Sequence, residues 1–223
     1  MQVLQNPSQQ SKKLWFVASG QPYDGGDPCF FDPQDFPWVK DLESQWPVIR
    51  DELEALLKER GDSLTPYFHP DLVSSEGVWK TFAMYFWGLK FRDKCKQCPQ
   101  TTRILESIPH MIGASFSMLE PESTIKPHHG DTNAIARCHL GLLIPAQLPE
   151  CGMGVGDEKQ SWEEGKLMMF CDAHKHTAWN HTPYRRFVLI VDVIRPEYAS
   201  QKFWVCFSVW KDIVKQWFKT RKK

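Results

Sequence analysis

Residues 137–144 read RCHLGLLI, and the polarity of the side chains alternates from one position to the next in the first part of this stretch. Arg137, His139 and Gly141 alternate with cysteine and aliphatic residues, which is the period-two pattern of a β-strand with one polar and one apolar face. A strand on the protein surface would show the same alternation. The dense apolar flanks and the glycine instead favour a polar face that lines the interior of a small barrel and holds an anionic ligand.

Short apolar or alternating runs lie on both sides of this strand, and proline and glycine residues separate them. Strands at this spacing predict a β-sandwich or a β-barrel, and helices that precede them are expected to pack on its outside. The predicted strands cover residues 79–87, 114–119, 137–144, 166–171 and 186–193.

The length of 223 residues fits one domain with four parts. Residues 1–35 are rich in glycine and proline and are expected to be irregular. Residues 36–60 carry apolar side chains at helical spacing, with Pro47 in the first turn of a second helix. Residues 78–195 are expected to form the β core, and residues 201–223 an amphipathic basic helix.

The overall composition narrows the class of protein. The net charge is zero and the pI is about 7.1, which argues against a nucleic-acid partner because no excess of positive charge would drive binding to phosphates. The polar N-terminus has no signal-peptide pattern, and no stretch is apolar for long enough to span a bilayer. Seven scattered cysteines then predict reduced thiols and a cytoplasmic protein. Cys95 and Cys98 have redox or zinc spacing but no second such pair, so we expect them to be structural.

Histidines in the segment KPHHGDTN, residues 126–133, offer a metal site together with the distant His176. Two registers are open. His129 with Asp131 gives the usual two-histidine, one-carboxylate triad of non-haem iron oxygenases, whereas His128 is followed at that spacing by Gly130. In an extended segment the two sets point to opposite faces, so both cannot bind the same ion. The residue types alone favour the first register.

Arg186 follows His176 by ten residues and begins an apolar strand. This spacing is what an Fe(II)/2-oxoglutarate oxygenase needs, because the histidine binds the metal and the arginine holds the far carboxylate of the cosubstrate. An arginine at the start of a strand is otherwise most often a surface charge. Its neighbour Arg185 is expected to point the other way, into solvent.

Five motifs in this order and spacing resemble the aspartyl/asparaginyl β-hydroxylase family between Ser117 and Val193, and residues 36–95 resemble it more weakly. The resemblance implies a mainly β fold with flanking helices, a double-stranded β-helix of the jelly-roll or cupin-like type. It implies Fe(II), 2-oxoglutarate and dioxygen as cofactor and cosubstrates. The motifs are PHHGDTN at 127–133, RCHLGLLIP at 137–145, WEEGK at 162–166, HTAW at 176–179 and RFVLIVDV at 186–193.

The same resemblance reverses the choice of register. The family holds iron with two histidines and has glycine where the carboxylate normally lies, so it implies His128 and His176 as the ligands and Gly130 as the vacant position. His129 then lies on the other face, and Asp131 becomes a loop residue or a group behind the ligands.

The resemblance also implies how the cosubstrate is bound. Ser117 and Arg186 match the residues that hold the C5 carboxylate of 2-oxoglutarate, and His139 matches a residue at its C1 carboxylate. Arg137 matches an arginine beside the metal that contacts an acidic group of the substrate. We therefore count His128, His176 and Arg137 as candidate catalytic residues.

The expected reaction is hydroxylation of a methylene beside a carbonyl-bearing group, with Asp or Asn in a peptide or protein as first choice. Two alternatives stay open: 2-hydroxylation of a lipid acyl chain, and a barrel that binds a small acid without catalysis. The peptide choice is weakened because Leu89-Lys90 stands where the peptide hydroxylases have a pair of arginines.

The C-terminal segment bears on the lipid alternative. Its aromatic and aliphatic residues share one helical stripe and its lysines another, which is typical of a helix at a membrane surface. A terminal helix packed on the barrel with a solvated basic edge would show the same pattern. The apolar stripe is Phe203, Phe207, Trp210, Val214 and Trp217, and the basic one is Lys211, Lys215 and Lys219.

Overall fold

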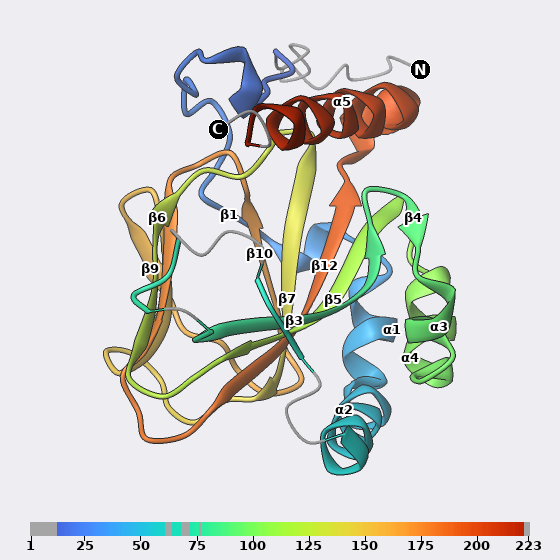
Figure 1. Ribbon diagram of the computed structural model, residues 1–223, viewed down its shortest axis with the longest axis vertical. Coiled ribbons are helices and arrows are strands. Elements are labelled where there is room, and N and C mark those ends of the chain that lie inside the picture. The colour runs from blue at the N-terminus through green and yellow to red at the C-terminus, as the bar shows by residue number, and fades with distance from the viewer. Residues whose placement is uncertain (1–12, 61–63, 68–71, 76, 221–223) are drawn as a thin grey trace, which may run out of the picture.

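Two antiparallel sheets face each other in the computed structural model, which describes residues 13–60, 64–67, 72–75 and 77–220 (Figure 1). This is the mainly β, jelly-roll arrangement that the sequence predicts. The large sheet has the order β1 (Phe30–Phe31), β10 (Leu167–Cys171), β7 (Ile135–Leu143), β12 (Arg186–Ile194), β5 (Met111–Leu119), β3 (Trp79–Phe86) and β2 (Thr65–Pro66), and β4 (Leu89–Lys90) also pairs with β3. The small sheet has the order β6 (Ser123–His128), β11 (His176–Asn180), β8 (Cys151–Val155) and β9 (Glu158–Gln160).

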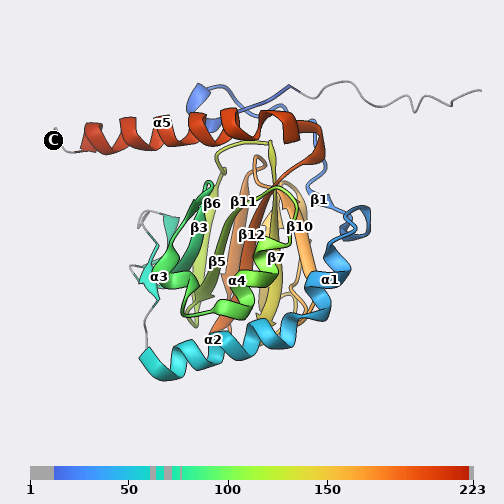
Figure 2. The same cartoon turned by 90° about the vertical axis from the view of Figure 1, so that its right-hand side faces the viewer.

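Helices cover the outer face of the large sheet (Figure 2). Their apolar side chains, such as Ile49 and Leu53, form one core with the outward side chains of the strands, including Cys138 and Leu140. The central strands are therefore buried on both faces, which explains their nearly continuous apolar sequences. These helices are α1 (Val39–Ser44), α2 (Trp46–Arg60), α3 (Arg92–Cys95) and α4 (Pro99–Glu106).

The inner face of the large sheet carries the polar residues that alternate along β7 and β12. In the pairing of these strands, Arg137 lies opposite Asp192 and His139 opposite Ile190. The interior position expected for Arg137 and His139 is therefore the position observed, because their alternating neighbours point to the helices instead.

Helix α5 (Lys202–Thr220) follows the short 3₁₀ helix η4 (Pro196–Gln201) and lies across one end of the two sheets (Figures 1 and 2). Val205 and Val209 on α5 pack with Tyr198, Ile112 and Ile135 in a core cluster of their own. The helix thus docks on the barrel. The predicted contributions of residues 221–223 and of the side chains of Trp217 and Lys219 lie outside the described part of the chain.

The sequence did not predict the helices α3 and α4, since residues 92–106 are polar and contain Pro99. That proline occupies the first turn of α4, where its missing N–H costs no hydrogen bond. Cys95 and Cys98 are buried here, and burial raises the pKa of the Cys98 thiol to about 12. Such a thiol is unreactive, which fits the structural role expected for this pair.

All four strands of the small sheet were missed as well, and two of them contain proline or glycine, which are typical of turns. Pro127 lies in β6, which is an edge strand and tolerates a residue without an N–H. Gly152 lies within β8, where a Cβ atom would come within 2.5 Å of the Leu148 side chain. Within the segment expected to be irregular, Phe30 and Phe31 form β1 at the edge of the large sheet.

Among the described residues, no helix is both long and apolar enough to cross a membrane.

Candidate active site

Two histidine side chains meet where β6 ends and β11 begins. His128 and His176 are paired across these strands, and their ring centroids lie 4.2 Å apart. Nδ1 of His128 donates to the backbone oxygen of Lys126, 2.8 Å away, and Nδ1 of His176 to that of His174, 2.9 Å away. Each ring therefore has its lone pair on Nε2, the tautomer in which imidazole binds a metal.

The environment also keeps His176 uncharged. Burial, and next the neighbouring His128, lower its pKa well below the ordinary value. Two imidazoles that line one pocket are a donor set that suits Fe(II) and other divalent first-row metals.

Gly130 has no room for a side chain. A Cβ atom added there would lie 1.6 Å from Oδ2 of Asp172, a fully buried carboxyl group on the segment before β11. A carboxylate two residues after His128 would thus occupy the space that Asp172 already fills. This packing explains in physical terms why glycine stands at the position expected to be vacant.

His129 contacts other residues than those of the pocket that contains His128 and His176. Its Nδ1 donates to the backbone oxygen of Ala173, 2.9 Å away, and its ring lies 6.3 Å from that of Trp15. Asp131 lies in the following loop, where its backbone oxygen accepts from the N–H of Val17. Neither residue lines the pocket that contains His128 and His176, so the geometry favours the register of His128 and Gly130.

Arg137 is held between two carboxylates. Its Nη1 lies 2.7 Å from Oδ1 of Asp172, and its Nε and Nη2 form a forked pair with Asp192 at 2.8 and 3.0 Å. Burial nevertheless raises the pKa of Asp172 to about 7. Oδ1 of Asp172 also lies 3.7 Å from Nε2 of His176, so this acid lies beside the ring nitrogen that could bind a metal.

Arg186 is the most unusual group of the site, because it is 1% exposed and no carboxylate pairs with it among the described residues. Its Nε and Nη1 atoms have no hydrogen-bond partner there. The ring of Trp162 lies 4.5 Å from the guanidinium carbon and partly compensates its charge. Burial lowers the pKa of Arg186 to about 10, so the group is still a cation at neutral pH and requires an anion.

Ser117 and His139 each present a donor to the same pocket. The Ser117 hydroxyl accepts from Nε1 of Trp79 at 3.0 Å, which leaves its own proton for another acceptor. Nδ1 of His139 accepts from Nε1 of Trp162 at 3.2 Å, and burial lowers the pKa of His139 well below its ordinary value. Its Nε2 therefore carries the proton, and this buried atom has no partner in the described structure.

Comparison with known proteins agrees with this arrangement. The family model described as aspartyl/asparaginyl beta-hydroxylase matches residues 43–196. The chain belongs to the aspartyl/asparaginyl β-hydroxylase family.

Two relatives in this family have names that state different substrates. The chain is 35% identical over 183 residues to an ornithine lipid ester-linked acyl 2-hydroxylase from Rhizobium tropici, a match that covers 80% of this chain and 64% of the relative. It is 33% identical over 169 residues to the aspartyl/asparaginyl beta-hydroxylase from Homo sapiens, covering 74% of this chain and 22% of that protein. The chain thus spans less than two thirds of either relative.

Among solved structures, a Pseudomonas putida prolyl-4-hydroxylase aligns with 67% of this chain and 87% of its own length, at 16% identity and a TM-score of 0.42. This likeness is too remote to indicate an activity.

An N-terminal segment outside the family match connects both ligand-bearing loops. The Val17 N–H donates to the backbone oxygen of Asp131, next to the His128 loop. Asp27 offers its backbone oxygen to Nε2 of His174, two residues before His176. Asp27 is itself fixed by a buried ion pair with Arg195 at 2.8 Å. In this family member, residues 15–27 therefore help to set the distance between His128 and His176.

An apolar groove of about 330 Å³ opens beside the pocket, and Trp79, Arg137 and Ile190 line both spaces. The groove follows alternate residues of β3, and the stretch from Trp79 to Tyr85 spans about 20 Å at the usual rise of a strand. Of the described residues that line it, Arg137 and Asp192 alone are charged, and they pair with each other. The other lining residues are Tyr67, Thr81, Ala83, Tyr85, Phe86, Phe91, Gly113, Ala114, Ser115 and Ile213.

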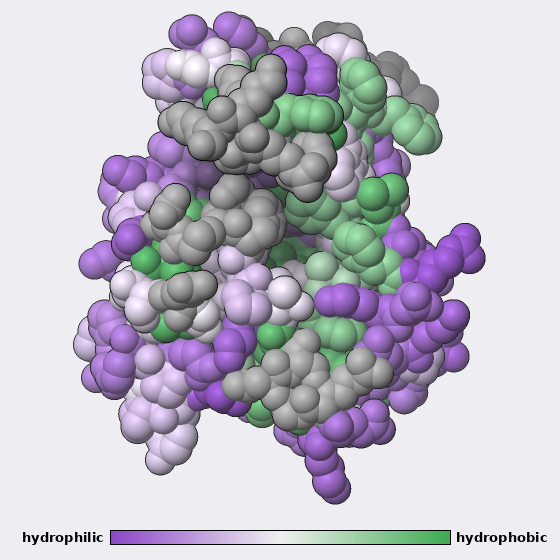
Figure 3. Space-filling model, in the orientation of Figure 1, coloured by the Kyte–Doolittle hydropathy of each residue, from purple (hydrophilic) through white to green (hydrophobic). Residues whose placement is uncertain are grey.

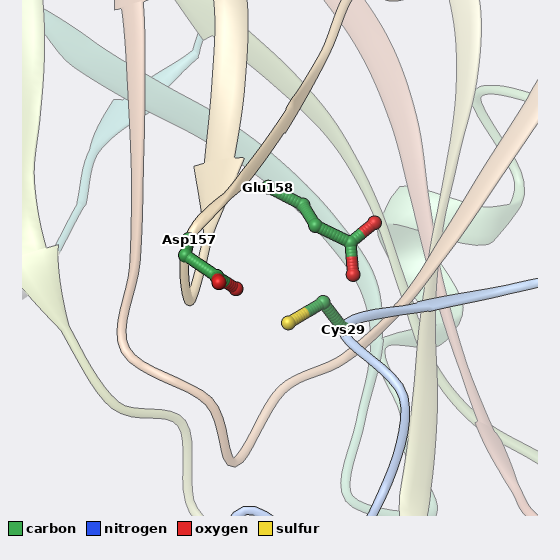
Figure 4. A group of neighbouring side chains, drawn as sticks. All are labelled: Cys29, Asp157 and Glu158. Atoms are coloured by element: carbon green, nitrogen blue, oxygen red, sulfur yellow. The ribbon is translucent and has the colours of Figure 1, made fainter.

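A second cluster of potential ligand atoms lies at the turn between β8 and β9. Cys29, Asp157 and Glu158 approach one another there (Figure 4), but both carboxylates are exposed. Burial, and next Glu158, raise the pKa of the Cys29 thiol, so it stays protonated. None of the three lines the pocket of His128 and His176, and we assign this cluster no function.

Sequence reasoning missed three residues of the site. Asp172 precedes His176 by four residues, and Trp162 begins the WEEGK motif, yet neither position indicates which pocket group it contacts. Asp192 lies in a strand that reads as apolar. Their roles follow from cross-strand pairing and from loops that meet only in the folded chain.

We expect His128→Ala to weaken Fe(II) binding by more than the roughly 10–100-fold that the loss of an outer partner of a ligand costs. His129→Ala, which removes one hydrogen bond to Ala173, is the matched control and should stay within that range. Anaerobic calorimetric titration with Fe(II) measures both. Stronger binding by the His128 variant than by the His129 variant would show that the register is wrong.

Arg186→Met removes the buried charge and keeps an unbranched side chain. The unfolding temperature of the ligand-free variant should equal or exceed that of the wild type, because an unpaired buried cation is costly. With Fe(II), 2-oxoglutarate at one hundred times its dissociation constant should raise the unfolding temperature of the wild type by roughly 5–10 °C. The variant should not respond.

Arg185→Met is the control for this experiment, because Arg185 is half exposed and pairs with Glu120 at 2.8 Å. It should respond to 2-oxoglutarate as the wild type does. A full response by the Arg186 variant would place the cosubstrate elsewhere.

Proposed function

We propose that this protein is an Fe(II)- and 2-oxoglutarate-dependent hydroxylase that oxidises a methylene beside a carbonyl group, with a lipid acyl chain as its substrate. The observation that supports the reaction class best is the buried Arg186, which has no carboxylate partner among the described residues, in the same pocket as His128 and His176. A dicarboxylate accounts for both features, because one carboxylate would pair with Arg186 and the other would chelate a metal bound by the histidines.

Bound at His128 and His176, Fe(II) would activate dioxygen and couple oxidative decarboxylation of 2-oxoglutarate, to succinate and CO₂, with insertion of one oxygen atom into a C–H bond. The chain's own groups bind and orient the diacid. Arg186 pairs with its far carboxylate, Ser117 donates its hydroxyl proton there, and the Nε2–H of His139 donates to the carboxylate nearer the metal.

The ligand-free pocket is narrow. Its volume is about 30 Å³. Met153 lines it, and this unbranched side chain can adapt to the shape of a bound diacid. A diacid that fills the pocket would exclude water from the reaction.

The groove beside the pocket supports the acyl substrate. Its wall is apolar over about 20 Å, and small side chains, Ala83, Gly113 and Ala114, leave space along it. Each methylene transferred from water to such a groove contributes about 0.8 kcal/mol. A chain that lies in the groove with its carbonyl end at Arg137 brings the adjacent methylene to the metal position.

β-Hydroxylation of Asp or Asn in a peptide is the competing candidate, supported by the identity with the human relative and by Arg137 at the junction of pocket and groove. A substrate carboxylate would need positive charge there. Arg137 already balances Asp172 and Asp192, and Lys90 pairs with Glu106. The described residues of the groove thus offer no cation in excess, and the acyl chain is the better match.

The test is turnover with ester- or amide-linked acyl lipids and, in parallel, with peptides that contain Asp or Asn. We expect lipid product with one oxygen atom from labelled dioxygen at C2, formed together with an equal amount of succinate. Ala83→Phe should fill the groove and abolish lipid product, while the 2-oxoglutarate-induced rise in unfolding temperature persists.

Peptide product without lipid product would refute the acyl substrate and leave the reaction class intact. Absence of succinate with either substrate, together with absence of the 2-oxoglutarate response, would refute the reaction class.

A further inference from the structure

Helix α5 has apolar side chains on two opposite faces. One face, with Val205 and Val209, is buried against the barrel. The other points to solvent, and its aromatic side chains are unusually exposed: Phe203 is 90% exposed, Phe207 59% and Trp204 55%. A helix that only docks on a barrel would have a polar outer face, so the outward face requires a separate explanation.

The outward apolar residues lie along one side of the helix in two pairs, separated by Trp210, whose ring packs on Phe86. Phe203 and Phe207 are one helical turn apart, and Val214 and Phe218 continue on the same side at spacings of seven and four residues. Figure 3 shows hydrophobic surface over α5, and further hydrophobic surface below it in that view. Leu89 and Phe91, beside the groove, are also exposed.

Positive charge accompanies these apolar residues. Lys211 and Lys215 lie on the exposed side of α5, and Lys215 approaches Asp212 at 3.7 Å. From residue 202 onward the sequence contains seven basic residues and one acidic residue. The rest of the chain therefore carries a net negative charge, because the whole protein is neutral. Aromatic side chains beside lysines are the combination that binds the interface of an anionic bilayer.

The groove connects this helix with the candidate active site. Arg137 and Trp79 line both the groove and the pocket of the two histidines, and Phe86 and Ile213 of α5 line the groove as well. Trp210 of α5 packs beside the groove: its ring contacts Phe86, and its Nε1 donates a 3.1 Å hydrogen bond to the backbone oxygen of Trp87.

We propose that the outward face of α5 binds the surface of an anionic lipid bilayer, and that an acyl chain enters the groove from this side, with its tail next to α5 and its carbonyl end at Arg137. The chain-entry part rests on the proposed acyl substrate, whereas the bilayer contact does not. In this orientation the tail stays closest to the bilayer, and the carbonyl end reaches the part of the groove that Arg137 lines.

Vesicle sedimentation without iron or 2-oxoglutarate tests the contact independently of any turnover. We expect the protein to bind vesicles of phosphatidylcholine with phosphatidylglycerol, and to bind phosphatidylcholine alone much more weakly. Phe203→Ser with Phe207→Ser should lower the partition coefficient about tenfold or more. Lys211→Glu with Lys215→Glu should lower it about tenfold at low salt and less at high salt.

Matched control variants distinguish vesicle binding through the outward face of α5 from nonspecific vesicle binding. Tyr184→Ser removes an exposed aromatic side chain away from α5, and Lys96→Glu with Lys159→Glu makes the same charge change elsewhere on the surface. Both controls should bind vesicles as the wild type does. The replaced side chains of α5 are exposed, so the unfolding temperatures of its variants should stay unchanged.

Three results would overturn the contact: no binding of wild-type protein to anionic vesicles, equal binding by the α5 variants, or light scattering that shows a dimer which the α5 variants disrupt. If the contact holds, short soluble acyl substrates should be turned over equally by wild type and α5 variants, and bilayer lipids only by the wild type. Equal turnover of bilayer lipids by both would refute chain entry beside α5 and leave the contact itself standing.

Discussion

The site depends on Arg186, a buried positive charge that no carboxylate neutralises among the described residues. Burial of an unpaired guanidinium costs several kcal/mol, and folding must supply this free energy from elsewhere. The large sheet does so, because β12 lies between β7 and β5 in the middle of a core that is packed on both faces. Trp162 covers the cation, and Ser117 and His139 direct donors to the same space. Under the proposed function, a carboxylate of the cosubstrate would neutralise this buried charge on binding.

A second constraint acts at the metal position. Asp172 fills the space of a Gly130 side chain, Arg137 holds Asp172, and Asp192 holds Arg137. The three charged groups form one buried network across three segments, so the absence of a side chain at residue 130 and the charge state of Arg137 are linked. The same network balances the charge of Arg137 beside the groove, which fits the proposed apolar substrate.

Much of this could be predicted from the sequence, for particular physical reasons. Period-two alternation alone placed Arg137 and His139 on the inner face, because the opposite side of β7 must face the helices. The choice of His128 with Gly130 came only from the family resemblance, since the space of a side chain at residue 130 is filled by Asp172, 42 positions away in the sequence. The missing partner of Arg186 could not be foreseen either, because counting the neighbours of a side chain requires the folded chain. Likewise, the sequence of α5 indicated one amphipathic helix and did not separate its two apolar faces. Only the folded chain shows which of the two faces the barrel covers.

The central claim is that a metal bound by His128 and His176 and a diacid bound by Arg186 share one pocket. Anaerobic titration of the metal-free protein with Fe(II) and then with 2-oxoglutarate tests it most directly, because a diacid that chelates the bound iron produces a weak visible charge-transfer band. The account predicts this band in the wild type, its loss in His128→Ala and His176→Ala, and a much higher 2-oxoglutarate requirement in Arg186→Met. Well-folded wild-type protein with neither the band nor tight iron binding would contradict the account and indicate a barrel that binds an acid without catalysis.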